Sequence, residues 1–287
     1  MEHFVWNIDP ELFRIGSFGP RYYGLLFATG FLVGYQIIKG IFLKEGRKEE
    51  DLSSLLFHIM LGTIIGARLG HCLFYEPAYY LTHPLEILKV WKGGLASHGG
   101  GIGVIIAVWL YKRQHNDQPY LWLADRLAIG IAFTGACIRL GNFFNSEIIG
   151  RPSDLPWAIV FARIDSIPRH PAMLYESLCY LVLFFVLWIF YKKKGPEFVP
   201  GRILGMMLIG IFTARFFIEY VKENQVAFES GLLLNMGQML SIPFIIAGIL
   251  FYTGKVAKWF PQLIQIPENP ASSDGSPKKK RKKAKSQ

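Results

Sequence analysis

The sequence is poor in the residues that build metal and redox sites. It contains only three cysteines, Cys72, Cys137 and Cys179, and each falls inside an apolar stretch. We interpret them as small buried apolar residues, because this odd set predicts neither a disulfide framework nor a metal site. No CxxC, HExxH, P-loop or Rossmann glycine pattern stands in a suitable context. We therefore expect a function that needs no metal and no cofactor.

Charged residues are almost absent from seven stretches of roughly 20 residues. A helix of that length can cross a hydrocarbon core of about 30 Å, whereas a soluble core would interrupt it with polar faces. The stretches cover residues 22–43, 52–75, 97–112, 121–142, 172–191, 203–221 and 232–253. The sequence thus predicts an all-α polytopic membrane protein with about seven transmembrane helices and a small arm and head region on the outer face.

A cleavable signal peptide is also missing, because the first twenty residues have neither a basic start nor an apolar central region. We expect these residues to form the arm, lying on the outer face of the membrane. Short loops rich in Lys and Arg tend to stay in the cytoplasm, and here they cover residues 43–50, 111–114 and 191–195. This pattern predicts an amino terminus outside the cell membrane and a carboxyl terminus in the cytoplasm.

The net charge of +10 could indicate nucleic-acid binding. Much of that charge, however, lies in the basic loops and in the low-complexity tail SPKKKRKKAKSQ. We interpret the tail as a solvated segment near anionic membrane lipids and expect no nucleic-acid partner. The predicted domains are a membrane domain of residues 1–260 and a disordered basic cytoplasmic tail of residues 261–287.

Ionisable residues nevertheless occur inside the predicted spans, where each is costly unless it is paired or faces water. Asp125 and Arg126 lie near the inner end of the fourth span, so we expect them to snorkel to the interface and leave them out of the site. Arg68 stands between glycines in GARLG, a spacing typical of close helix packing, and a structural role is equally open. The other such residues are Arg139, Glu176, Arg215 and Glu219.

Arg215 and Glu219 are four residues apart in ARFFIE, which places them on one helical face where they can pair. One interpretation is an ion pair that only fixes helix packing. The other is that both residues meet a lipid headgroup, since they lie near the outer end of the sixth span.

The densest polar stretch is CIRLGNFFNSEIIGR, residues 137–151. Arg139 and Asn142 are three residues apart and share a face if the fourth span stays helical to that point. Asn145, Glu147 and Gly150 follow as the chain leaves the membrane. So much polarity at the end of an apolar span predicts either a buried, satisfied network or a wet cavity.

Two histidines lie next to glycine or proline residues, which influence the backbone conformation. His98 precedes three glycines in SHGGGIG, and it could be a catalytic base or a cap that fixes a tight turn. His170 precedes Pro171, which suits a helix start, and an interfacial histidine in such a place usually caps or packs. The sequence leaves these alternatives open.

Taken together, the segments NIDPELFRIG, RYYG, GARLGHCLFY, SHGGGIG, RLGNFFNSEIIGR, RHPAMLYE and RFFIEY resemble the bacterial phosphatidylglycerol:prolipoprotein diacylglyceryl transferases. The resemblance implies a multi-pass enzyme of the bacterial inner membrane. It implies transfer of the diacylglyceryl group of phosphatidylglycerol to the lipobox cysteine of a prolipoprotein signal peptide. A thioether forms and glycerol 1-phosphate is released.

The resemblance also implies a set of site residues. The essential, phosphate-binding arginines of the family fall on Arg139 and Arg215, and its motif histidine falls on His98. Its substrate-binding residues fall on Tyr23, Asn142, Glu147, Gly150, His170 and Glu219. The chain departs from the family pattern at four positions. It has Ile129 where a proline is common, Ile138 where a glycine is usual, and Ile211 and His71 where many members have tyrosine, so the sixth span lacks that hydroxyl group.

The implied chemistry makes two demands. A thiol with a reference pKa of about 8.5 must lose its proton, and the departing phosphate needs cationic donors already aimed at it. Arginine suits the second demand because its planar fork donates two hydrogen bonds to phosphate oxygens. His98 is a candidate base for the first demand, with a scaffold role as the alternative.

Two other classes of membrane protein fit parts of the pattern. A transporter or lipid-binding protein could line its path with intramembrane arginines, although the chain has no internal repeat. A seven-span receptor fits the helix number alone. Formation of a diacylglyceryl adduct on a lipobox peptide separates the transferase from both.

Overall fold

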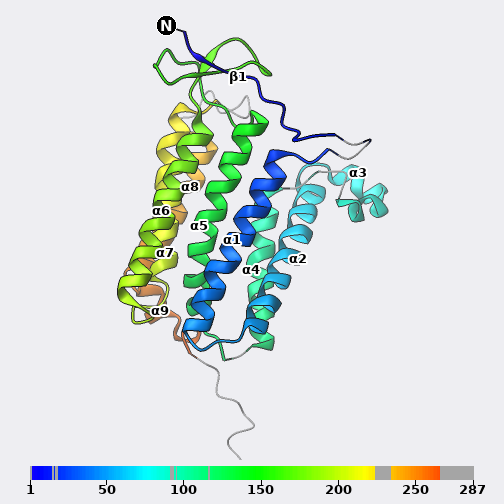
Figure 1. Cartoon of the computed structure of the whole chain (residues 1–287). Helices are drawn as coiled ribbons and strands as arrows, with labels where there is room; N and C mark the ends of the chain where they lie inside the picture. The colour runs from blue at the N-terminus through cyan, green and yellow to red at the C-terminus, as the bar shows by residue number, and fades with distance from the viewer. Residues whose placement is uncertain are drawn as a thin grey trace, which may run out of the picture.

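The computed structural model describes residues 2–14, 16, 19–90, 94, 96–115, 117–223 and 234–265. Long helices dominate it (Figure 1). They are α1 Tyr22–Lys44, α2 Glu49–Phe74, α4 Ser97–Gln114, α5 Tyr120–Asn145, α6 Ala172–Lys194, α7 Arg202–Ile218 and α8 Met236–Tyr252. Shorter elements are β1 Phe4–Trp6, α3 Pro77–Thr82, η1 Pro84–Leu88, β2 Ile159–Phe161, β3 Pro168–Arg169, η3 Glu219–Val221, α9 Lys255–Trp259 and η5 Pro261–Leu263.

Each predicted span coincides with one long helix, so the predicted all-α membrane architecture is confirmed. Five helices of the described chain are long and apolar enough to cross a membrane, namely α1, α2, α5, α6 and α7 continued through η3. Helix α8 is apolar but only 17 residues long, and α4, a continuous helix of 18 residues, is not among the candidate spans. A total of seven crossings stays a prediction.

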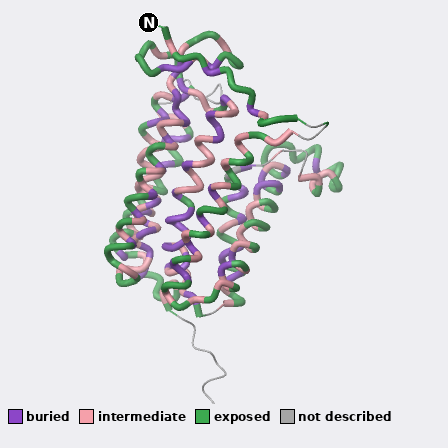
Figure 2. Tube along the Cα trace, viewed as in Figure 1, coloured by how far each residue is buried: buried purple, intermediate pink, exposed green. Residues whose placement is uncertain are grey.

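Helix α5 is the centre of the bundle. In its apolar window 56% of the residues are buried, against 22–28% in the other four candidate spans. Figure 2 shows the same contrast, with buried residues following α5 and exposed ones on the outer helices. Small residues such as Ala128, Ala132 and Ala136 let α1, α6 and α7 pack closely around it. The apolar outer surfaces are what lipid contact requires.

Helices α2 and α4 meet along a glycine seam, which we define as Gly62, Gly66 and Gly70 of α2 with Gly99 and Gly103 of α4. A Cβ atom added to Gly66, Gly99 or Gly103 would overlap the backbone of the facing helix. Small residues at four-residue spacing allow this close approach in membrane helices. Gly99 and Gly103 of SHGGGIG therefore serve close packing here, and none of the glycines in this motif has a positive φ.

Arg68 supports the same pair of helices from a buried position in α2. Its guanidinium donates hydrogen bonds to the carbonyl oxygens of Glu86 at 2.6 Å, Ile87 at 2.9 Å and Gly94 at 3.3 Å. These bonds tie the connection between α2 and α4 to the bundle. The structural interpretation of Arg68 accounts for its position.

The expectation that Asp125 and Arg126 snorkel is wrong, because both side chains are buried. Arg126 forms an ion pair with Glu45, with Nη2 at 2.8 Å from Oε2, and Glu45 also accepts from Tyr191 Oη and Trp122 Nε1 at 2.7 Å each. We call Glu45, Arg126, Trp122 and Tyr191 the tail-end cluster. Asp125 accepts the backbone N–H groups of Gly201 and Leu204 and so satisfies the start of α7.

A small head covers the opposite end of the bundle (Figure 1). Its sheet has the order β1-β2-β3, with β1 parallel and β3 antiparallel to β2. Trp6 of β1 packs on Phe143 at the end of α5, with ring centroids 4.1 Å apart. The predicted arm thus supplies a strand to the head, and it holds the head on α5.

The cysteines are free thiols, and their exposure differs from the sequence-based expectation. Cys72 is buried, Cys137 is half-buried and Cys179 is exposed. Cys179 lies on the surface of α6, where an apolar environment would also suit it. Most of the predicted basic tail, residues 266–287, lies outside the described residues.

Candidate active site

The site begins where α5 ends. Ser146 adopts a left-handed conformation with φ of 55°, and the N–H of Glu147 returns to the carbonyl of Asn142 at 2.9 Å. Ile148 is also left-handed, with φ of 58°. A non-glycine residue in this region is strained, and such strain clusters at functional sites. Glu147 is therefore held in place between two unfavourable backbone positions.

The Glu147 carboxylate is bound by two side-chain amides. Asn142 Nδ2 donates to Oε2 at 3.0 Å, and Asn145 Nδ2 donates to Oε1 at 3.1 Å. Arg139 Nη1 in turn donates to Asn142 Oδ1 at 3.4 Å. The structure thus brings together the residues that the spacing in the polar stretch predicted to share a face.

Arg139 also belongs to a buried ion network that links α5, α6 and η3. Its Nε lies 2.8 Å from Glu176 Oε2. Lys222 Nζ lies 2.8 Å from Glu176 Oε1 and 2.9 Å from Glu219 Oε2. Glu176, Glu219 and Lys222 are all buried. We call these residues, together with Arg215, the head-end cluster.

Arg215 is the exception within the head-end cluster. Its Nε is buried and has no hydrogen-bond partner, and no ion pair joins its guanidinium to another described residue. Tyr180 of α6 lies within electrostatic reach of both Arg139 and Arg215. The two guanidinium groups therefore approach the same part of the bundle, and only that of Arg139 has a carboxylate partner in the described chain.

The interpretation of Arg215 and Glu219 as an ion pair with each other is wrong in this structure, whereas the alternative, that both meet a lipid headgroup, stays a prediction. Helix α7 ends at Ile218, and the chain tightens into the 3-10 turn η3 at Glu219. The turn from Arg215 to Glu219 is nevertheless α-helical, because the N–H of Glu219 donates to the carbonyl of Arg215 and Glu219 has φ of −61° and ψ of −24°. The spacing thus permits the pair, and the packing around Glu219 decides against it. Glu219 instead lies against Gly237 in the first turn of α8 and pairs with Lys222.

Gly150 joins the α5 exit to the end of η3. Its N–H donates to the carbonyl of His170 at 2.9 Å, and a Cβ on it would lie 2.7 Å from the Val221 carbonyl oxygen. Arg151 N–H donates to that carbonyl at 2.8 Å, and Arg151 Nε donates to the Lys222 carbonyl at 2.9 Å. This close crossing fixes the backbone that carries Lys222.

Tyr23 and His170 flank the head-end cluster without joining its ion pairs. The Tyr23 ring packs on α5, 2.8 Å from where a Cβ on Gly141 would lie, and it is within electrostatic reach of Arg139 and Glu147. His170 Nδ1 lies 3.2 Å from Tyr175 Oη, which also accepts from Trp157 Nε1. His170 thus contributes its backbone to the site and its side chain to the head.

The structure does not bring His98 to the head-end cluster. His98 is exposed in the first turn of α4, and α4 packs mainly on α2 along the glycine seam. Within the described residues, no hydrogen bond or ion pair joins His98 to Arg139 or Arg215. In Figure 1, α2 and α4 form one flank of the bundle, and α6, α7 and α8 form the other.

Glu176 and Lys222 are the members of the site that sequence reasoning missed. Glu176 had a signal, since it is an acidic residue inside a predicted span. Lys222 had a weaker one, because it follows Glu219 by three residues just beyond the sixth span. Neither spacing indicates that the two residues meet across different helices.

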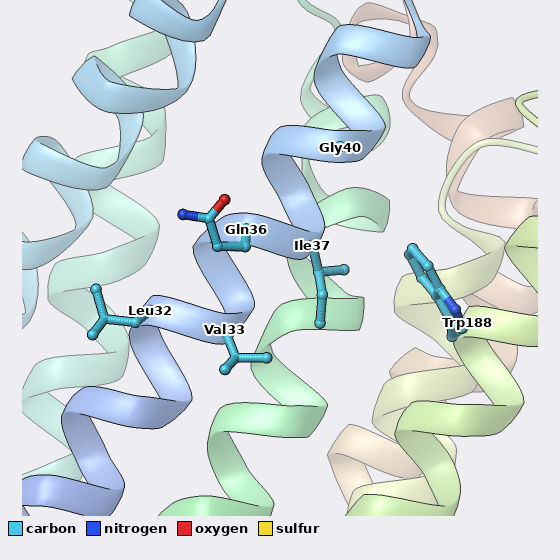
Figure 3. Close-up of a pocket in the computed structure, with 6 residues that line it drawn as sticks. All are labelled: Leu32, Val33, Gln36, Ile37, Gly40 and Trp188. Atoms are coloured by element: carbon cyan, nitrogen blue, oxygen red, sulfur yellow. The ribbon is translucent and has the colours of Figure 1, made fainter.

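An open groove of about 420 Å³ lies on another part of the bundle. Figure 3 shows Leu32, Val33, Gln36, Ile37 and Gly40 of α1 on one side and Trp188 of α6 on the other. None of these residues is ionisable, so the groove cannot supply acid-base or phosphate-binding groups. The described residues also contain no group of three or more His, Cys, Asp or Glu placed to hold a metal ion.

Comparison with known proteins gives one consistent result. Residues 10–253 match the family model described as prolipoprotein diacylglyceryl transferase. A protein of Tolumonas auensis is 54% identical over 85% of this chain and 95% of its own length, and one of Chloroherpeton thalassium is 46% identical over 86% and 92%. A Bacteroides fragilis protein is 47% identical over 87% and 95%. All three are named phosphatidylglycerol–prolipoprotein diacylglyceryl transferase.

Proposed function

The chain belongs to the prolipoprotein diacylglyceryl transferase family, and on that premise we propose that the head-end cluster is where it binds the phosphate of phosphatidylglycerol. The protein is a multi-pass membrane enzyme that transfers a diacylglyceryl group from phosphatidylglycerol to prolipoproteins in lipoprotein maturation. The proposal concerns the residues that perform this transfer. It also places the acceptor thiol in a lipobox cysteine and the head on the outer face of the cytoplasmic membrane.

The reaction is a displacement at the glycerol carbon next to the phosphate. The sulfur forms a new C–S bond, the C–O bond to phosphorus breaks, and the electron pair leaves with the phosphate of glycerol 1-phosphate. The phosphodiester monoanion thereby becomes a monoester with additional negative charge. Preorganised cations that contact this phosphate stabilise the transition state more than the bound substrate.

The observation that carries the proposal is the state of Arg215. The Arg215 side chain is half-buried, its Nε is buried without a hydrogen-bond partner, and no carboxylate of a described residue pairs with it. An unpaired cation at such a position is costly, so it is retained where a ligand supplies the missing anion. The head-end cluster contains three cationic side chains and two carboxylates and thus has an excess of positive charge. A phosphodiester has the single negative charge that complements it, and arginine can bind two of its oxygens.

The remaining predicted residues receive roles around this phosphate. Asn142 and Glu147 orient Arg139 or hold the hydroxyl groups of the glycerol headgroup, and Tyr23 closes the α1 side. Gly150, His170 and Glu219 keep the surrounding backbone and charges in place. His98 either accepts the thiol proton or supports the α4 start, and a base role requires the acceptor peptide to reach toward α4.

The test is transfer to a lipobox peptide in phosphatidylglycerol micelles, followed by the mass of the peptide. We expect the wild-type enzyme to add a diacylglyceryl group to the cysteine and Arg215→Lys and Arg139→Lys to lose about 100-fold or more in kcat/KM. Arg163→Lys, in an exposed head turn, is the matched control and should keep its activity. An arginine variant with full activity would refute the phosphate clamp, and transport without any adduct would refute the transferase.

The same assay separates the two roles of His98. A base predicts that His98→Gln loses the inflection of the rate between about pH 5.5 and 7.5 together with most of its activity. A support role predicts that this variant keeps substantial activity and the same pH profile. The assay uses saturating phosphatidylglycerol, so that differences in lipid binding do not affect the rates that are compared.

A further inference from the structure

Lys222 forms two close ion pairs that have no direct part in the transfer chemistry. Its ammonium group is buried between Glu176 at 2.8 Å and Glu219 at 2.9 Å. Its backbone is fixed by the bridge to Gly150 and the hydrogen bond from Arg151. A lysine held this firmly has its charge committed to two carboxylates.

Arg139, Arg215 and Lys222 all lie near Glu219, and among the described residues only Lys222 forms an ion pair with it. Arg215 precedes it by four residues on the same segment, yet the carboxylate binds Lys222 and the Arg215 Nε stays buried without a partner. Charges compete for partners at close range, and a carboxylate paired with one cation attracts a second less strongly. Because Lys222 is paired with Glu219, Arg215 remains available to bind another anion.

We propose that Lys222 is a positioning residue that holds Glu219 away from Arg215, so that Arg215 is free to bind an anionic phosphodiester. Lys222 neutralises the acid that would otherwise pair with the arginine. Glu219 follows Arg215 by one α-helical turn, with its N–H bonded to the Arg215 carbonyl, so that without Lys222 its carboxylate is within reach of the arginine. The inference rests on the proposed function for the identity of the phosphodiester, which is a phospholipid headgroup.

This role differs from direct contact with the lipid in a way that a double variant reveals. If Lys222 acts only by occupying Glu219, its loss is harmful because Glu219 turns to Arg215. Removing the charge of Glu219 as well then restores a free Arg215. If Lys222 itself binds the phosphate, neutralising Glu219 cannot replace the missing ammonium group.

The experiment measures binding of a fluorescent phosphatidylglycerol to the full-length protein in phosphatidylcholine nanodiscs, without peptide. We expect Lys222→Met to weaken binding about tenfold, within the range of coupling between charges in contact. The double variant Lys222→Met with Glu219→Gln should return to within about threefold of Glu219→Gln alone. Lys222→Arg should bind like the wild type, and so should Lys39→Met, which removes an ion pair with Glu49 at the other end of the bundle.

Transfer rates give a second readout. We expect Lys222→Met to raise the KM for phosphatidylglycerol more than it lowers kcat, and the double variant to reverse that rise. A double variant that binds no better than Lys222→Met overturns the inference. If Lys222→Met does not fold, as judged by thermal unfolding in micelles, Lys222→Gln is compared in the same cycle. Binding is scored without turnover, so a failure of the transferase assignment and a failure of this inference give different results.

Discussion

The bundle buries ionised side chains at both ends, and the two clusters differ in whether their charges balance. In the tail-end cluster, the Arg126 guanidinium and the Glu45 carboxylate pair with each other, and Tyr191 and Trp122 donate to the remaining lone pairs of Glu45. In the head-end cluster, three cations share two carboxylates and Arg215 is left over. Charges that are all paired stabilise the fold, whereas a cluster with an unpaired cation can bind an anionic ligand.

The largest effect should come from breaking the tail-end pair. Arg126→Met leaves the Glu45 carboxylate buried without its cation, and we expect a loss of about 3–5 kcal/mol in the free energy of unfolding. Arg215→Met removes a charge that has no ion-pair partner among the described residues, so its stability should fall by less than about 1 kcal/mol or rise. Thermal unfolding in detergent micelles measures both.

A matched double variant sharpens this contrast. Glu45→Gln with Arg126→Met removes both charges and should recover most of the stability lost in Arg126→Met. Transfer activity per folded molecule should stay near wild type in the tail-end variants. If Arg215→Met were as unstable as Arg126→Met, the distinction between a cluster with an unpaired cation and a fully paired cluster would not hold.

The sequence predicted the parts of the site that lie close together along the chain. Helical spacing placed Arg139 and Asn142 on a common face, and Glu147 follows a few residues later in the same polar stretch. It could not predict that Arg126 pairs with Glu45, which is 81 residues away, and the expected snorkelling was therefore wrong. Pairing across helices depends on packing, and no local period encodes it.

The same limit explains why the ion pairs of the head-end cluster were not predicted. Glu176 and Lys222 are 46 residues apart and meet because α6 begins where η3 ends, at the same level of the bundle. The spacing of Arg215 and Glu219 did allow a pair, since one α-helical turn joins them, but Glu219 pairs with Lys222 instead. The helices themselves followed from the apolar stretches, because their length and lack of charge suffice to predict them.

An intermediate effect should come from the glycine seam, which has no charge at all. Gly103→Val would force a side chain into the backbone of α2 at Gly62, and overpacking of this kind costs about 1–3 kcal/mol. Gly101→Val is the control in the same motif, because a Cβ there meets no atom within 4 Å. Equal thermal midpoints for the two variants would contradict the assignment of these glycines to helix packing.

The smallest effect should come from an ion pair that water reaches. In the head, Arg169 Nη2 donates to Asp165 Oδ2 at 2.6 Å, and this hydrogen bond holds the pKa of the Asp165 carboxyl below its ordinary value. A lowered pKa in the folded state means that the pair stabilises the protein above about pH 4, the ordinary range of the group. The contribution disappears as the pH falls through the folded-state pKa. Arg169 is buried and Asp165 is partly exposed, so water reaches the carboxylate side of the pair, and we expect Asp165→Asn to cost about 1 kcal/mol at neutral pH.

Comparing thermal midpoints at pH 7, 5 and 3 tests this pair against the buried clusters. The difference between wild type and Asp165→Asn should be similar at pH 7 and 5 and shrink toward pH 3, because the wild-type carboxyl is then protonated as well. Asp154→Asn, at an exposed position of the same head, should show no such change. A difference that persists undiminished at pH 3 would mean that Asp165 acts through its shape and its hydrogen bond from the Ile167 N–H. Its ionisation would then contribute nothing, unlike that of Arg126 and Glu45, where burial makes the loss of one charge costly.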